Sequence, residues 1–228
     1  MYLLSTSKLR KVYSKELLKP VDVLKGIDLN VRDGEFLSLM GPSGSGKSTL
    51  LNILGLLDLP TSGSVQFRGQ VISGLNSDSK ALLRNEKFGF VFQGFNLLKK
   101  NSVLENICLP LLYSGTSRTQ AKKLADEVLD VTGLGDLGNR FPAQLSGGQQ
   151  QRVAICRALI VEPELLLADE PTGNLDSVTA SQIMNIFKQL NKEKGITIIL
   201  VTHDAEIARY SSRLIRMQDG EIKSDEKI

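Results

Sequence analysis

The stretch Gly41-Pro42-Ser43-Gly44-Ser45-Gly46-Lys47-Ser48 decides the fold of this chain. It fits the pattern G-x-x-x-x-G-K-[ST] at every position. Residues 36–40 before it are typical of a buried strand, and residues 49–54 after it are typical of the start of a helix. Strand, glycine-rich turn and helix form the context in which this pattern binds phosphate. The sequence therefore predicts a phosphate-binding loop here, and not an ordinary turn with a chance lysine.

The residue types in this loop suit a nucleotide. Glycines let the backbone curl so that successive N–H groups point at one anion, and the helix start adds the positive end of its dipole. Lys47 can reach the β- and γ-phosphates as a point charge, and the Ser48 hydroxyl can ligate Mg²⁺. We expect the whole loop, with Thr49 directly behind it, to contact the bound nucleotide.

Composition narrows the class of protein. The chain has 228 residues, of which 41% are hydrophobic and 23% charged, as in a globular protein with one good core. The formal net charge of +3 is too small to argue for nucleic acid or anionic lipid. Cys108 and Cys156 lack metal-type spacing and are expected to be reduced thiols, with Cys156 in packing. No apolar run approaches the roughly 20 residues of a membrane helix, and residues 1–6 lack the pattern of a secretion signal.

Polar residues follow three apolar strands. Gln93 comes after 88–92, the carboxylates Asp169 and Glu170 end the run 165–168, and the single histidine, His203, follows 196–201. Ligands bind at the carboxyl ends of parallel strands. Asp169 can hold a metal or its water, and Glu170 can polarise an attacking water. The alternatives are an idle loop glutamine, a strand that ends in solvent and a structural histidine.

Between Gln93 and this carboxylate strand the character of the sequence is helical. The segment ends in Ser146-Gly147-Gly148-Gln149, where two glycines precede a well-marked helix and form a second potential anion site. The apolar side chains of Phe95, Leu97, Leu98 and Leu104 are expected either to pack this subdomain or to grip a short helix of a membrane partner.

The predicted fold class is α/β: a mostly parallel sheet core, an N-terminal antiparallel β subdomain and an inserted α-helical subdomain. We predict one domain over 1–228, with 1–93 and 153–228 as the core and 94–152 as the helical subdomain. Asp33-Gly34 and residues 218–221 carry hairpin signals. Tyr13 is either a half-buried structural residue or a stacking partner for an adenine ring.

In this order the motifs resemble the ATP-binding cassette (ABC) ATPases, a family with the RecA-like P-loop NTPase core, and the resemblance spans nearly the whole chain. It implies ATP and Mg²⁺ as ligands, catalytic roles for Lys47, Glu170 and His203, and metal ligands at Ser48, Gln93 and Asp169. It also implies that Tyr13 stacks on adenine, although the long basic segment 14–20 leaves the exact neighbour of the base open. It further implies a head-to-tail dimer, in which the signature residues of one chain cap the nucleotide held by the other, next to the D-loop residue Asp176. Those signature residues are Ser146, Gly147, Gly148 and Gln149.

Within that family the stretches 91–97, 145–152 and 168–176 resemble the LolD/MacB type. This implies an ATPase that energises a separate permease of LolCE or MacB type, at the cytoplasmic face of the inner membrane, for lipoprotein release or for export of a hydrophobic compound or peptide. An FtsE-like cassette that regulates cell division through a membrane partner is the alternative. A soluble cassette acting on ribosomes or DNA fits less well, because such chains usually carry two cassettes or a long coiled-coil insertion; no nucleic-acid partner is expected.

Overall fold

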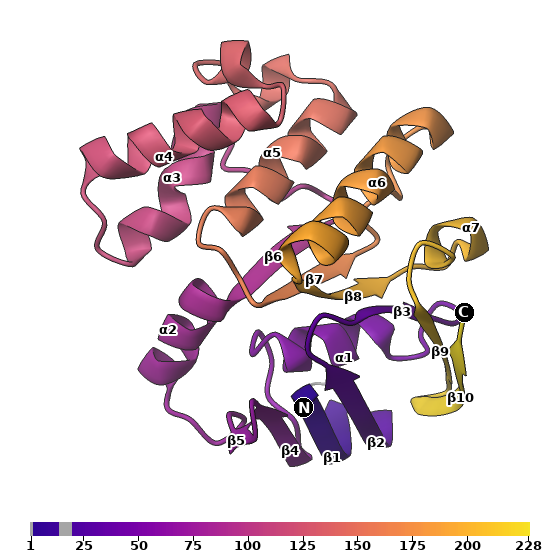
Figure 1. Ribbon diagram of the computed structural model, residues 1–228. Helices are drawn as coiled ribbons and strands as arrows, with labels where there is room; N and C mark the ends of the chain where they lie inside the picture. Colours follow the sequence, from indigo (N-terminus) through magenta and orange to yellow (C-terminus); the bar gives the residue numbers. More distant parts are fainter. Residues whose placement is uncertain (1, 14–19) are drawn as a thin grey trace. The chain divides into compact units, whose positions relative to one another are not determined.

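The computed structural model describes residues 2–13 and 20–228, and residues 14–19 of the basic lead-in lie outside this description. The chain divides into two compact units. The first comprises Met1–Ala81 and Phe187–Ile228, and the second comprises Leu82–Ile186. Two helices, α2 (Ser77–Lys87) and α6 (Ser177–Lys194), carry the chain from one unit to the other (Figure 1).

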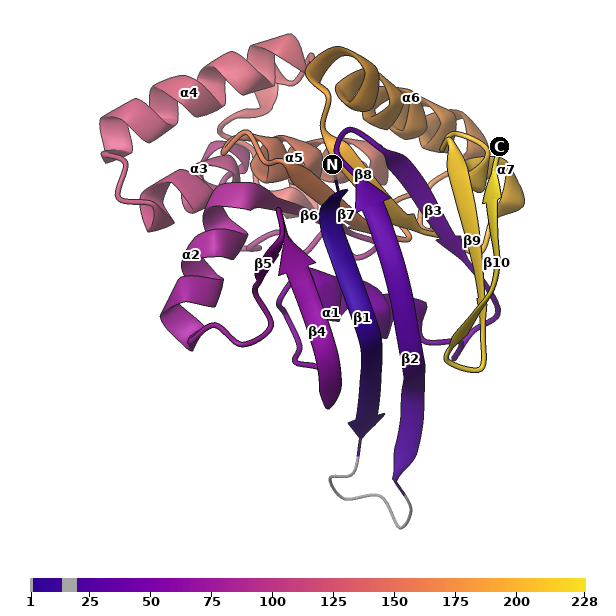
Figure 2. The same cartoon turned by 60° about the horizontal axis from the view of Figure 1, so that its bottom comes forward.

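The first unit contains an antiparallel sheet in the order β2-β1-β4-β5. Its strands are β1 (Tyr2–Tyr13), β2 (Val21–Arg32), β4 (Ser62–Phe67) and the short β5 (Gln70–Val71). Figure 2 shows β4, β1 and β2 side by side. The buried side chains of β2 alternate with exposed ones over Ile27, Leu29 and Val31, as expected for a strand with one face on the core. The predicted antiparallel β subdomain is confirmed.

The same unit contains the strands around the phosphate loop, in the order β10-β9-β3-β8. They are β3 (Phe36–Met40), β8 (Thr197–Val201), β9 (Arg213–Gln218) and β10 (Glu221–Lys227), and the helices are α1 (Lys47–Leu54) and the short α7 (Ala205–Ala208). β3 pairs in parallel with β8 and β9. Every residue of β3 and of β8 is buried, which fits parallel strands covered on both faces.

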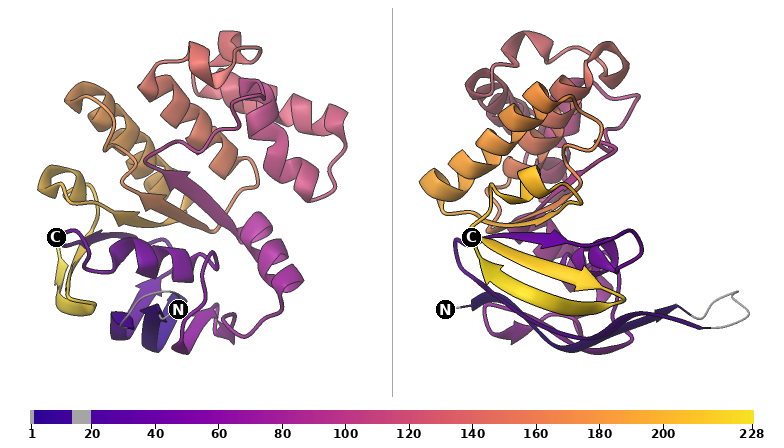
Figure 3. Two further views of the ribbon diagram at one scale, coloured as in Figure 1. Left: turned by 180° about the vertical axis from the view of Figure 1, so that it is seen from behind. Right: turned by 90° about the vertical axis from the view of Figure 1, so that its right-hand side faces the viewer.

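The two hairpin signals have different outcomes. Asp219 and Gly220 both have positive φ, 51° and 81°, and they join β9 and β10 into an antiparallel hairpin (Figure 3). At the other signal only Gly34 has a positive φ, 73°, and the turn leads from β2 into β3, which belong to different sheets. The expected hairpin at Asp33-Gly34 is therefore wrong. A two-residue hairpin turn of type I′ needs positive φ at both central residues, and Asp33 does not adopt it.

The second unit contains a parallel pair, β6 (Phe88–Phe92) and β7 (Leu165–Asp169), and a helical subdomain. The helices are α3 (Val103–Tyr113), α4 (Arg118–Val131), α5 (Gly147–Leu159) and the 3₁₀ turns Gly135–Leu137 and Pro142–Gln144. Their core gathers buried residues from α3, α4 and α5, with Ile107, Leu129 and Val153 fully buried. Cys156 lies in this core, where burial raises the pKa of its thiol to about 11, so it is a packing residue as expected.

Among the described residues, no helix combines the length and apolar character needed to cross a bilayer.

Candidate nucleotide site

The phosphate loop leaves β3 and enters α1 through backbone that only glycine accommodates. Gly41 has φ +155°, and a Cβ there would lie 2.1 Å from the carbonyl oxygen of Met217. Gly46 has φ +97°, and a Cβ there would lie 2.9 Å from the carbonyl oxygen of Val23. Both glycines of the motif are therefore required by close backbone approach as well as by conformation.

Lys47 is held above this loop. Its ammonium donates to the carbonyl oxygens of Gly41 at 2.8 Å and Pro42 at 2.9 Å, and its side chain is buried. Behind it, the first N–H groups of α1 have no acceptor within the helix, as at any helix start. A fixed cation and a row of N–H donors on one curled loop form a site for a polyanion.

His203 follows the carboxyl end of β8, beside the carboxyl end of β3 from which the phosphate loop starts. Leu39 of β3 lies opposite Val201 of β8, and the Thr202 N–H donates to the Leu39 carbonyl at 3.1 Å. After His203, the Asp204 carboxylate accepts from the Glu206 N–H at 2.7 Å and caps α7. The exposed imidazole of His203 is thus placed by ordered backbone on both sides, as expected for a strand-end residue.

In the second unit, Gln93 and the two carboxylates lie at the carboxyl ends of the paired strands β6 and β7. Phe92 of β6 lies opposite Asp169 of β7, so Gln93 and Glu170 directly follow paired residues. The Gln93 side-chain amide donates to the Asn174 Oδ1 at 3.3 Å, and the Asn174 amide donates back to the Gln93 carbonyl at 3.0 Å. A Cβ at Gly173 would lie 2.7 Å from the Gln93 amide nitrogen, so this pairing depends on the glycine.

Glu170 adopts an unusual backbone conformation. Its φ is +47°, in the left-handed region, and the Gly173 N–H donates to its carbonyl at 3.1 Å. Gln151 of α5 is fully buried and donates to the Pro171 carbonyl at 2.7 Å, which fixes the turn from the other side. A left-handed conformation is unfavourable for a residue with a Cβ, so the surrounding contacts must hold Glu170 there.

The signature segment begins α5. The Ser146 hydroxyl accepts from the Gln149 N–H at 3.3 Å, and the Gln149 side chain accepts from the Ser146 N–H at 2.9 Å, a complete capping box. A Cβ at Gly148 would lie 2.5 Å from the Thr179 methyl, so the helix start lies against α6. Asp176 accepts from the Thr179 hydroxyl and N–H at 2.6 and 2.9 Å, and these donors lower its pKa.

Comparison with known proteins decides the family. The model of the family described as ABC transporter matches residues 24–173. The chain belongs to the ABC transporter family.

Individual relatives agree with this assignment. The cassette is 49% identical to the lipoprotein-releasing system ATP-binding protein LolD of Aquifex aeolicus, over 94% of this chain and 95% of the relative. It is 51% identical to the macrolide export ATP-binding/permease protein MacB of Syntrophobacter fumaroxidans, over 99% of this chain but 32% of that relative. The chain thus spans about a third of the length of the MacB relative.

Solved structures confirm the predicted fold class. The cassette MJ0796 of Methanocaldococcus jannaschii, a dimer bound to ADP and Pi, matches with a TM-score of 0.91 at 45% identity and 98% coverage of both chains. The present chain is therefore an ABC ATPase with the cassette fold, homologous to the LolD and MacB nucleotide-binding proteins.

The cassette structure brings the predicted site residues together in two groups. The first unit holds the phosphate loop, His203 and Tyr13, and the second holds Gln93, the carboxylates, the signature segment and Asp176. Their roles at a nucleotide remain predictions. Sequence reasoning missed Asn174 and Arg157 as partners of the Gln93 loop. Arg157 of α5 donates to the carbonyls of Phe95 and Asn96 at 3.0 and 2.6 Å.

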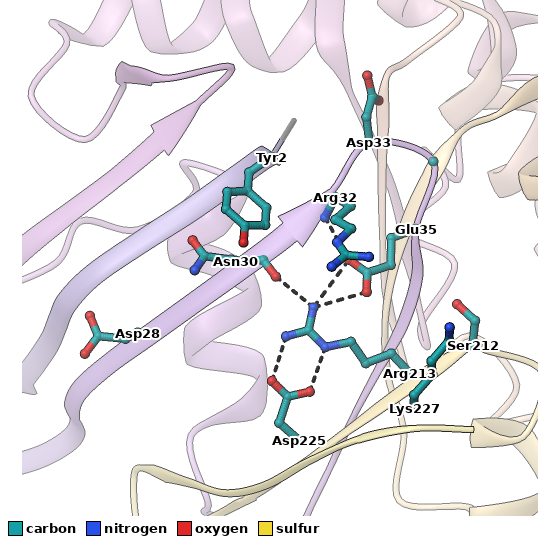
Figure 4. A pocket seen from close by; sticks show the side chains of 11 residues that line it. Tyr2, Asp28, Asn30, Arg32, Asp33, Glu35, Ser212, Arg213, Asp225 and Lys227 are labelled. Atoms are coloured by element: carbon teal, nitrogen blue, oxygen red, sulfur yellow. Dashed lines mark hydrogen bonds and ion pairs between the residues drawn. The ribbon is translucent and has the colours of Figure 1, made fainter.

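A hollow of about 640 Å³ in the first unit is a separate feature of the cassette. Glu35, in its lining, precedes β3, and the phosphate loop follows β3, so the two lie roughly 16 Å apart along the strand. Figure 4 shows Arg213 between Asp225 and Glu35. Its guanidinium donates twice to Asp225 at 2.7 Å and also to the Asn30 carbonyl at 2.7 Å. This network joins β2, β9 and β10 and is a structural tie.

Proposed function

We propose that this chain is the ATP-hydrolysing subunit of a transporter whose membrane-spanning permease is a separate polypeptide of LolCE or MacB type. The observation that carries the proposal is the phosphate loop with its buried Lys47, in a chain that matches LolD over nearly its full length. The cargo is a lipoprotein, a hydrophobic compound or a peptide. The subunit acts at the cytoplasmic face of the inner membrane, where the permease holds it.

The residues proposed for Mg²⁺ fit this ion. Ser48, Gln93 and Asp169 supply hydroxyl, amide and carboxylate oxygens, the hard ligands that Mg²⁺ prefers. The amide nitrogen of Gln93 donates to Asn174, and its amide oxygen is the atom proposed to ligate the ion. Mg²⁺ at such sites is usually bound by one or two carboxylates together with substrate phosphates. When bound, Mg²⁺ neutralises charge on the phosphate oxygens.

The chain's own residues have distinct tasks. When a nucleotide binds, the Lys47 ammonium gives up its hydrogen bonds to the loop carbonyls and donates to β- and γ-phosphate oxygens instead. Glu170 accepts a proton from the attacking water, and its fixed backbone keeps the carboxylate oriented. His203 donates to a γ-phosphate oxygen. Tyr13 stacks on the adenine ring.

A second copy completes each site. Ser146, Gly147 and Gly148 of one copy face the nucleotide on Lys47 of the other, beside Gln149 and Asp176. The Ser146 hydroxyl accepts its capping bond and so keeps its own proton to donate to a phosphate oxygen. Two anion-binding helix starts in one chain fit one ATP shared between two copies.

Metal removal tests the hydrolytic part of this proposal. With excess EDTA, phosphate release from ATP should fall at least about 100-fold, because the ion contributes several kcal/mol of charge stabilisation. Added Mg²⁺ should restore phosphate release by the wild type. The Asp169→Asn variant should not regain the wild-type rate at the Mg²⁺ concentrations that are optimal for the wild type. Hydrolysis that continues unchanged in EDTA would contradict the proposed role of Ser48, Gln93 and Asp169.

The burial of the apolar residues in the helical subdomain indicates which of them can contact the permease. Leu104 is only 5% exposed and belongs to the helical core, and Leu97 packs against that core, so both have structural roles. Leu98 is 47% exposed. Its backbone is fixed by the buried Asn106, whose side chain accepts from the Leu98 N–H at 2.7 Å and donates to its carbonyl at 3.1 Å. Leu98 is thus a rigidly presented apolar side chain, suited to docking a short amphipathic helix.

We expect Leu98→Glu to lose co-purification with the permease encoded beside this chain, with an unchanged melting temperature and unchanged ATP binding. Tyr113→Glu is the matched control, because it alters an 81% exposed apolar residue in the same subdomain and should leave the complex intact. Retention of the complex by Leu98→Glu would place the docking surface elsewhere.

A further inference from the structure

Tyr13 is fixed at the end of β1 by contacts from several sides. Its hydroxyl donates to Asp58 Oδ2 at 2.6 Å, and the Thr49 side chain is near enough to act on the pKa of the phenol. The Lys11 ammonium lies over its ring, 4.6 Å from the centroid. The residue is nevertheless 41% exposed. Among the described residues the cation lies over one face of the ring, and the exposed part of the ring is open to a planar ligand.

Asp58 connects the side chains of Lys11 and Tyr13, both on β1. Its Oδ1 accepts from the Lys11 ammonium at 2.6 Å and from the Leu59 N–H at 2.7 Å, while Oδ2 accepts from Tyr13. Lys11 also donates to the Leu59 carbonyl at 2.7 Å, and its side chain is largely buried. Lys11, Asp58 and Tyr13 therefore form one network, which we term the tyrosine clamp.

The clamp borders the phosphate loop. Thr49 stands in the first turn of α1, directly after Ser48, and Asp58 follows the end of the same helix. The β1 end is also tied to this region by the Val12 N–H, which donates to the Thr61 hydroxyl at 2.9 Å. The ring of Tyr13 thus has a fixed position relative to the loop in the first unit.

The geometry points to Lys11 and Asp58 as positioning residues that hold the Tyr13 ring ready to stack on the purine base of a nucleotide bound at the phosphate loop. An ordered side chain loses no rotamer freedom on binding, so the clamp raises affinity by preorganisation. The cation also polarises the ring from its far face. This inference rests on the proposed function and adds to it two specificity residues that contact no phosphate.

Two members of the clamp, Tyr13 and Asp58, have shifted pKa values. Burial and the Asp58 carboxylate raise the pKa of Tyr13 above its usual 10.0. Burial opposes ionisation of Asp58, but the hydrogen bonds from Lys11, Tyr13 and the Leu59 N–H outweigh it, and the pKa of Asp58 is lowered from 3.8. The phenol therefore stays a donor and the carboxylate an acceptor at neutral pH.

The test compares ADP, which has a base, with inorganic pyrophosphate, which lacks one, by calorimetric titration of the full chain with Mg²⁺. Lys11→Met and Asp58→Asn should each raise the Kd for ADP about 2- to 10-fold and leave that for pyrophosphate unchanged. Lys11→Arg should keep the wild-type ADP affinity, because a guanidinium can also stack and pair with Asp58. A purely structural role would shift both ligands equally or neither, and either result would overturn the inference.

Two controls separate this inference from the proposed function. Arg10→Met removes a neighbouring cation of β1, paired with Asp22 at 2.7 Å, and should change neither affinity. Lys47→Ala should abolish binding of both ligands; if it does not, the proposed function itself fails. If Lys47→Ala abolishes binding but Tyr13→Ala leaves ADP affinity intact, the base does not stack on Tyr13. That result disproves the clamp and the adenine role of Tyr13, while the hydrolytic role of the phosphate loop stands.

Discussion

Glu170→Gln should reduce ATP turnover by a factor of about 10² to 10⁴, the usual contribution of a general base, with ATP binding retained. The amide keeps the shape of the carboxylate, and the left-handed backbone at φ +47° is equally accessible to Gln. Binding without turnover should make ATP-bound dimers accumulate. Phosphate release gives the rate, and size-exclusion chromatography with and without ATP gives the dimer.

The control for this variant is Lys47→Ala, which should neither hydrolyse ATP nor accumulate as ATP-bound dimers. Equal turnover in Glu170→Gln and wild type would mean that another residue accepts the proton, and His203 would be tested next. A variant that neither binds ATP nor dimerises would instead show that residue 170 acts on binding.

The second prediction concerns a site shared between two copies. Neither Lys47→Ala nor Ser146→Arg alone should hydrolyse ATP. Mixed in equal amounts, half of the dimers are mixed, and each of these has one site with both Lys47 and Ser146 intact. Activity should therefore return to about a quarter of the wild-type level if the two sites work independently.

A matched control tests whether the loss of a helix N-cap by itself abolishes activity. Ser146→Arg removes the N-cap of α5, at a cost of about 1 kcal/mol. Ser117→Arg removes the equivalent cap of α4, whose serine accepts from the Gln120 N–H at 3.3 Å, but lies outside the signature segment. Ser117→Arg should stay active. If mixed dimers form and remain inactive, each chain builds its own complete site.

Local features of the site were predictable because the residues that form them are neighbours in sequence. The phosphate loop needed only the glycine spacing and its flanking strand and helix. The Asp219-Gly220 hairpin and the buried Cys156 followed from the same kind of local pattern. That Gln93 and Glu170 follow apolar strands was predictable in the same way, whereas the register that pairs Phe92 with Asp169 became visible only in the structure.

Contacts between distant segments were not predictable in this way. The pairing of Gln93 with Asn174 spans 81 positions, and that of Lys11 with Asp58 spans 47. The same limit explains the Asp33-Gly34 error, because its local signal was real but β2 and β3 pair with other strands. It also explains why Leu98 and Leu104 looked alike in the sequence although one is exposed and the other is core.

The contact of Arg157 with the loop after β6 has a consequence for the order of folding. Phe95 and Asn96 have φ of +59° and +48°, a left-handed conformation that Asn tolerates but that is unfavourable for Phe. The guanidinium that binds their carbonyls comes from 62 and 61 positions later. We therefore expect the loop to become fully ordered after α5 has formed and docked on β6. During synthesis it should be among the last parts of the second unit to gain protection from hydrogen exchange, and Arg157→Ala should leave it unprotected in the finished protein.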